Sequence, residues 1–165
     1  MEFDLLKEKE KQKIVSHFLE RYAVPKDCFK DYIFLKNKHF VWIGNKELED
    51  FLYQRLNFYS VGFLFLMDVK TFKPTTATIR FLDKNIKRNL LLLNEEEAKS
   101  FFAGKKFSIT EKEASVLDST GYVALRNEKY FLGSAWFDKK LLSIHPNISR
   151  TDYDVIEADY FLRKK

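Results

Sequence analysis

The first 22 residues carry their hydrophobic positions at helical spacing. The pattern predicts a helix over residues 3–22, whose apolar side consists of Ile14, Val15, Phe18, Leu19 and Tyr22. The alternating charges of K-E-K-E-K-Q-K in the same stretch indicate a solvated helix face. Pro25 is expected to close this element.

Shorter apolar runs follow the predicted helix. Tyr32–Leu35 and His39–Ile43 have strand character and flank Asn37-Lys38, which suits a hairpin turn. A second helix is expected to begin at Gly44-Asn45. Its apolar stripe would consist of Leu48, Phe51, Leu52 and Leu56.

The next two segments are predicted to pair as strands. Val61–Val69 is almost continuously apolar, which is typical of a buried strand. In Thr75–Leu82, polar residues alternate with apolar ones, so we expect a half-exposed strand paired with the buried one. The charged segment Asp83–Asn89 is the expected domain boundary.

Leu90–Leu93 is expected to enter the second domain, and the stretch after it begins with strong helix signals. Asn94 suits an N-cap, Glu95–Glu97 favour the positive end of the helix dipole, and Gly104 suits the left-handed end. Lys105 and Lys106 follow at once.

Two longer strands are then predicted, Gly121–Arg126 and Tyr130–Phe137, with a tight turn at residues 127–129. A short strand at Leu141–Ile144, a turn at residues 145–147 and a closing strand at Asp154–Leu162 complete the chain. The element order indicates an α+β protein with two domains, an α+β domain over residues 1–86 and a small β-barrel-like domain over residues 87–165.

Composition and charge limit the possible classes of protein. A hydrophobic content of 45% in 165 residues allows a packed core, and the single cysteine, Cys28, excludes an internal disulfide framework and a cysteine-based zinc site. No apolar run reaches membrane-spanning length and the first residues do not resemble a signal peptide, so we expect a cytoplasmic protein without membrane contact. The net charge of +5 permits a nucleic-acid partner without requiring one.

Several runs are similar to a known family. The run E-E-E-A-K-S-F-F-A-G-K-K-F-S-I resembles the opening of a PUA domain, an RNA-binding fold, and G-Y-V-A-L-R-N-E-K-Y-F-L-G-S-A-W-F resembles its central hairpin. The run F-V-W-I-G-N-K-E-L-E-D-F-L-Y-Q-R-L-N-F-Y-S-V-G resembles part of a pre-PUA domain. A pre-PUA domain followed by a PUA domain is similar to archaeal and eukaryotic ribosome-biogenesis factors that assist large-subunit pre-rRNA processing.

The resemblance implies an RNA-binding site on the second domain. Lysines after the helix would neutralise phosphates, other basic residues would form a rim, and exposed aromatic side chains would stack on unpaired bases. The candidate RNA-binding residues are Lys105, Lys106, Arg126, Lys129, Trp136, Lys139, Lys140 and Arg150, and Tyr130 and Phe137 are further stacking candidates. For the lysines, an ordinary solvated surface is the competing interpretation, and for the aromatics it is a place in the core.

The inventory for catalysis is small. His17, His39 and His145 show no triad order or metal-ligand spacing, and Asp27 next to Cys28 would disfavour a thiolate. We therefore expect a non-enzymatic RNA-binding protein without cofactor or metal, acting on rRNA with or without another assembly protein. The alternatives are an RNA-docking subunit of a tRNA-modifying enzyme of the archaeosine-transglycosylase type and a protein-interaction scaffold.

Overall fold

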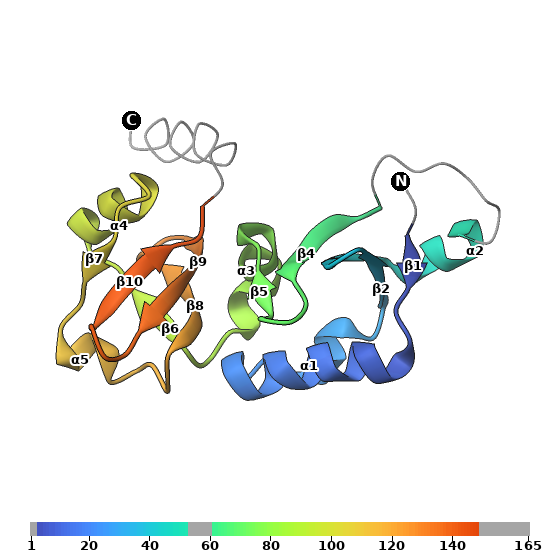
Figure 1. Ribbon diagram of the computed structural model, residues 1–165, viewed down its shortest axis with the longest axis horizontal. Coiled ribbons are helices and arrows are strands. Elements are labelled where there is room, and N and C mark those ends of the chain that lie inside the picture. Colours follow the sequence, from blue (N-terminus) through green and yellow to red (C-terminus); the bar gives the residue numbers. More distant parts are fainter. Residues whose placement is uncertain (1–2, 53–60, 149–165) are drawn as a thin grey trace. The chain divides into compact units, whose positions relative to one another are not determined.

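The structure, a computed structural model, describes residues 3–52 and 61–148 (Figure 1). Contacts divide the chain into two compact units, Met1–Arg88 and Asn89–Lys165. In the described residues each unit combines helices with one five-stranded sheet, which confirms the α+β class. The predicted closing strand Asp154–Leu162 lies outside the described residues.

The sheet of the first unit is antiparallel, and its strands follow one another in chain order. Its strands are β1 (Asp4–Leu5), β2 (Tyr32–Asn37), β3 (Phe40–Asn45), β4 (Phe63–Asp68) and β5 (Lys73–Pro74). The predicted hairpin is confirmed as β2–β3, with Lys38 at its turn in a left-handed conformation (φ 57°).

Helix α1 (Glu8–Tyr22) packs its apolar side into the core of this unit, because Ile14, Phe18 and Tyr22 are all buried. The predicted helix over residues 3–22 was too long at its start. Asp4 and Leu5 pair with β2 as strand β1, since the chain is still extended at Lys7. The helix ends on left-handed Ala23, and the short 3₁₀ helix η1 (Lys26–Phe29) follows Pro25.

The segment after β3 differs from the single helix expected from Gly44. Asn45 caps the 3₁₀ helix η2 (Lys46–Leu48) by accepting a hydrogen bond from the Glu47 N–H, and α2 (Glu49–Leu52) is four residues long. The predicted stripe residue Leu56 lies outside the described residues. In β4, only Phe65 and Leu66 are fully buried, so the expected buried strand is largely half-buried.

The strand predicted for Thr75–Leu82 is wrong, because this segment is helix α3 (Thr76–Leu82). The Thr75 hydroxyl caps it by accepting from the Thr78 N–H at 3.1 Å, and it donates to the Leu64 carbonyl at 2.7 Å. Ile79 and Leu82 then fall on the buried side of the helix at a spacing of three residues. The threonines that suggested a strand serve here as a cap and as buried helix positions.

An aromatic stack ties the β4–β5 turn to α1. The rings of His17 and Phe72 lie 4.2 Å apart between centroids and only 9° from parallel. The backbone of Phe72 is in the left-handed region (φ 49°), which residues other than glycine rarely adopt. Burial, with Arg21 nearby, lowers the pKa of His17 to about 4, so the stacked ring is neutral at pH 7.

The first unit ends at Arg88 and the second begins at Asn89, with no separate linker between them. The backbone N–H groups of Lys87 and Arg88 donate to the Tyr22 carbonyl at 2.9 and 3.2 Å, after the short 3₁₀ helix η3 (Asp83–Asn85). The next residue, Asn89, belongs to the second unit and is fully buried. Its side chain donates to the Asp118 carboxylate and accepts from the Asp118 N–H.

The second sheet is mixed and curls into a half-barrel (Figure 1). Its spatial order is β6 (Leu90–Leu92), β8 (Gly121–Arg126), β9 (Phe131–Asp138), β10 (Ser143–Pro146) and β7 (Phe107–Ser108). Strand β6 pairs parallel to β8, and the other pairs are antiparallel. The predicted hairpin is confirmed as β8–β9.

Two helices cover the core of the second unit, α4 (Glu95–Phe102) and α5 (Glu111–Ala114). The predicted capping signals of α4 are confirmed, because Asn94 accepts from the Glu97 N–H and the Glu97 carboxylate accepts from the Asn94 N–H. Phe101 and Phe102 pack into the same core as Phe137.

Strand β10 lies two residues later than expected. Asp138 accepts hydrogen bonds from the Lys140 and Leu141 N–H groups, which places residues 139–142 in a turn. His145 and Pro146, expected in a turn, pair with β9 instead.

Candidate nucleic-acid interface

Lys105 and Lys106 directly follow the end of α4. Gly104 takes a left-handed conformation (φ 60°), and the Lys105 N–H donates to the Ser100 carbonyl at 2.9 Å, so the helix ends and the chain turns. Lys105 and Lys106 are both exposed immediately before β7. This end of α4 is therefore fixed while both ammonium groups face solvent.

The β8–β9 hairpin tip carries two more candidates, which have different environments. Arg126 is half-buried: its guanidinium lies 5.2 Å from the Phe131 ring centroid and donates to the Asn127 carbonyl. Lys129 is exposed, and its N–H donates to the Asn127 side chain in the turn. Arg126 thus has a structural role in the tip.

The turn between β9 and β10 carries Lys139 and Lys140, which are both exposed. The Lys139 ammonium donates to the Asp118 carbonyl at 3.0 Å, and its N–H donates to the Thr120 hydroxyl. Lys139 therefore helps to hold the loop before β8 against this turn.

The register of β8 and β9 separates these basic groups. Arg126 pairs with Phe131 at one end of the hairpin, whereas Gly121 pairs with Phe137 at the other end, next to the Lys139–Lys140 turn. At about 3.3 Å per residue, the two ends of β8 are roughly 17 Å apart. The basic residues therefore do not form the single rim that was expected. Arg150 lies outside the described residues.

Aromatic side chains form a row across the outer face of the sheet. Tyr122, Trp136 and His145 are successive cross-strand partners on β8, β9 and β10, and the Tyr122 and Trp136 rings meet edge to face at 5.0 Å. Trp136 is 38% exposed, the most open position of β9. Val123 and Phe137, which alternate with these residues, point into the core instead, so Phe137 is not available for stacking.

The lysine pair lies near this row. Phe107 on β7 pairs with Ile144 on β10, so Lys106, one residue before Phe107, is at the level of His145. The row thus runs from Tyr122 through Trp136 and His145 towards Lys106. Sequence reasoning missed Tyr122 and His145, whose only signal was an alternation that had to be aligned across three strands.

Two further observations concern chemistry. Burial, together with the neighbouring Asp27, raises the pKa of the Cys28 thiol, which agrees with the expectation that a thiolate is disfavoured. Across residues 3–52 and 61–148, no three His, Cys, Asp or Glu side chains are grouped so that they could hold a metal ion. Within the same ranges no helix has both the length and the apolar character needed to span a membrane.

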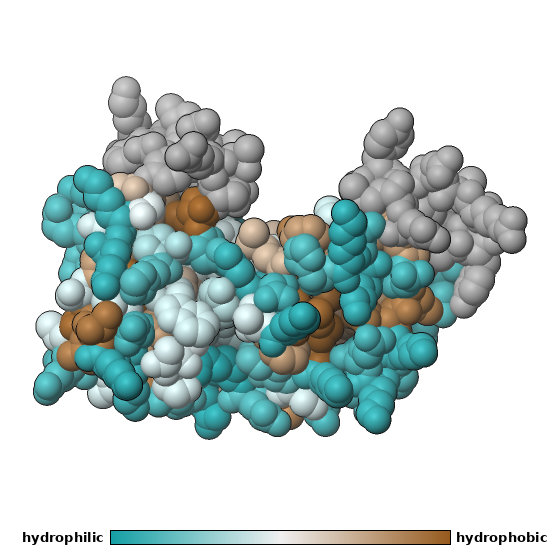
Figure 2. All heavy atoms as spheres, viewed as in Figure 1, coloured by the Kyte–Doolittle hydropathy of each residue, from teal (hydrophilic) through white to brown (hydrophobic). Residues whose placement is uncertain are grey.

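The surface of the described residues is mainly hydrophilic in the view of Figure 2, and hydrophobic atoms lie in separate patches. In comparisons with known proteins, no family model matches the chain, and no curated protein matches it.

Proposed function

We propose that this chain is a non-catalytic RNA-binding protein that holds unpaired bases on the outer face of its second sheet. The observation that carries the proposal is the row of Tyr122, Trp136 and His145, with exposed Trp136 at its centre. Aromatic faces on a sheet bind bases of any sequence, because every base has a π-face.

Charge beside the row completes the proposed site. Lys105 and Lys106 are exposed at the β7 edge and would neutralise phosphates of a strand whose bases stack on the row. Lys139 and Lys140 lie in the turn between β9 and β10, three and four residues after Trp136 along the chain. The proposed path of the RNA therefore crosses the strands from β7 towards β8.

The kind of RNA follows from the family resemblance. A pre-PUA and PUA pair would place this protein in ribosome biogenesis, on large-subunit rRNA or its precursor. Docking of a tRNA for a modifying enzyme is the alternative. Crosslinking the chain to total cellular RNA and sequencing the captured fragments would distinguish the two.

The test of the site is the Trp136→Ala variant. We expect its affinity for a fluorescein-labelled oligouridylate to fall about 5- to 150-fold, because stacking contributes about 1–3 kcal/mol per base. Trp136→Phe should recover part of the affinity. Fluorescence anisotropy at constant salt measures these changes.

The matched control is Tyr130→Ala, since Tyr130 is 45% exposed but lies at the hairpin tip, away from the row. Its affinity should remain close to that of the wild type. Equal affinities for Trp136→Ala and wild type would show that the row is not the binding site.

A further inference from the structure

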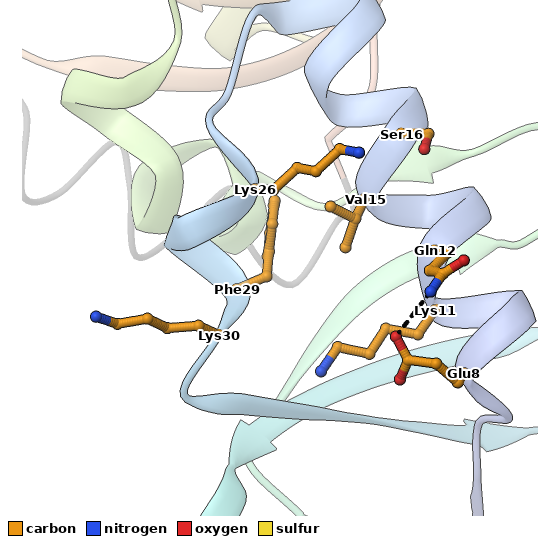
Figure 3. Close-up of a pocket in the computed structure, with 8 residues that line it drawn as sticks. All are labelled: Glu8, Lys11, Gln12, Val15, Ser16, Lys26, Phe29 and Lys30. Atoms are coloured by element: carbon orange, nitrogen blue, oxygen red, sulfur yellow. Dashed lines mark hydrogen bonds between the residues drawn. The ribbon is translucent and has the colours of Figure 1, made fainter.

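The first unit contains an open groove between α1 and η1 (Figure 3). Its volume is about 380 Å³, and its lining residues are Glu8, Lys11, Gln12, Val15, Ser16, Lys26, Phe29 and Lys30. Five of these residues come from α1, and the other three lie on or directly after η1. The groove therefore has two walls from segments that are close in sequence.

The walls carry an excess of positive charge. Three lysines line the groove, whereas Glu8 is its one carboxylate. Figure 3 shows Lys11 reaching from α1 towards η1 and Lys26 reaching back towards α1. Two ammonium groups thus extend across the groove from opposite sides.

The position of Lys11 is fixed by the fold. Its ammonium group donates to the Tyr32 carbonyl at 3.0 Å and lies 5.9 Å from the Phe34 ring centroid. An ammonium group has three donors, and this bond occupies one of them. Lys11 is therefore positioned before any ligand arrives, which lowers the entropy cost of binding.

The floor of the groove is apolar and rigid. Val15 and Phe29 are 8% and 1% exposed, and the Phe29 ring packs against Phe18 and Phe34 in the core. Charged groups above an apolar floor are less screened than groups that project into water. This floor separates the groove from an ordinary lysine-rich surface.

The same fold explains which lysines of the K-E-K-E-K-Q-K run take part. Lys11 lines the groove, whereas Lys9 and Lys13 are exposed on α1 and do not line it. The helical turn therefore divides a run that looked uniformly solvated into a groove side and a solvent side.

We propose that this groove, within the first unit, binds the phosphodiester backbone of RNA. Lysine binds phosphate as a point charge, and the groove offers no arginine fork for the paired oxygens of a carboxylate. Its open form suits a passing strand. The inference rests on the proposed RNA-binding function.

The first test neutralises the three lysines that line the groove in the full chain, as K11Q/K26Q/K30Q. The control, K13Q/K46Q/K84Q, removes three exposed lysines outside the groove. Binding of a labelled oligouridylate is measured at several salt concentrations. We expect the groove variant to lose at least about tenfold in affinity, with a salt slope shallower by about 0.7 per lost phosphate contact. The control should lose much less.

Two further variants protect the test from effects on folding. K26Q/K30Q leaves the structural bond of Lys11 intact and should still lose affinity selectively. Glu8→Gln removes the groove carboxylate, whose oxygen accepts from the Gln12 side chain at 3.2 Å, and should raise RNA affinity severalfold. A merely structural role would not produce that gain.

The possible results distinguish a failure of the groove proposal from a failure of the proposed RNA-binding function. Two results would overturn the groove proposal alone. One is an equal loss of RNA affinity in the groove and control triple variants. The other is displacement of the oligouridylate from the groove by polyglutamate but not by polyphosphate. The second result would indicate an acidic peptide as its ligand. Absence of oligouridylate binding by the wild type would overturn both proposals.

Discussion

Individual side chains set two properties of this protein that their sequence neighbours did not reveal. Trp136 is exposed although Ala135 and Phe137, on either side of it, are fully buried. His17 is held as a neutral ring against Phe72. The first property follows from the alternation of β9 and the second from a contact with a residue far away in the chain, so the residue type alone could not supply either.

The low pKa of His17 predicts how stability depends on pH. In the folded state the pKa of His17 is about 4, mainly because the ring is buried, whereas in the unfolded chain it has the ordinary histidine value of 6.5. Between these values the unfolded state binds more protons, so stability is full above pH 6.5 and falls as the pH drops towards 4.

Urea unfolding at a series of pH values would measure this effect. In His17→Phe the aromatic stack is kept but the titrating group is absent, so we expect a flatter dependence between pH 6.5 and 4. A wild-type and a variant curve with the same slope in this window would contradict the assignment.

At the scale of elements, the sequence predicted most of the second sheet and its helix. The α4 cap and the β8–β9 hairpin have strong local signals, an Asn-x-x-Glu pair and a tight polar turn. The segment Thr76–Leu82 has only seven residues, and both an alternating and a helical pattern fit such a length. Thr75 decides between them through the cap that it forms.

The role of this cap is testable. Thr75→Ala removes the oxygen that accepts from Thr78 and the hydroxyl that donates to Leu64, so we expect a loss of about 1–2 kcal/mol in the free energy of unfolding. Thr75→Ser keeps both hydrogen bonds and should cost much less. Chemical denaturation of the two variants gives the comparison, and equal stabilities would show that the hydroxyl is unimportant.

At the scale of the whole molecule, strand register limits what the sequence can predict about the site. The residues Tyr122, Trp136 and His145 become neighbours only through pairings across three strands, and the same pairings separate Arg126 from Lys139. Composition and local motifs supplied the candidate charges. They could not show which charges share a surface, because that depends on register.

The transition between the units gives a prediction at this scale. Lys87 and Arg88 both bind the Tyr22 carbonyl, so a fragment of residues 1–88 should be more stable than one of residues 1–86. The Arg88 guanidinium also donates to the Glu20 carbonyl, but this bond is exposed, so the two backbone hydrogen bonds at about 0.5–1.5 kcal/mol each set the expected difference of about 1–3 kcal/mol. Thermal or urea unfolding of the two fragments measures it, and identical curves would show that these bonds contribute nothing.

The two sheets also differ in when their strands can find partners during synthesis. Strands β2 to β5 each pair with the strand that precedes them in the chain, so the first sheet can be completed as it is translated. Strand β6 can pair only after β8 has been synthesised. Strand β7 can pair only after β10, the last strand among the described residues, has been synthesised. A nascent chain halted before Ser143 would therefore leave β7 without its partner strand, and Phe107 would lose its contact with Ile144.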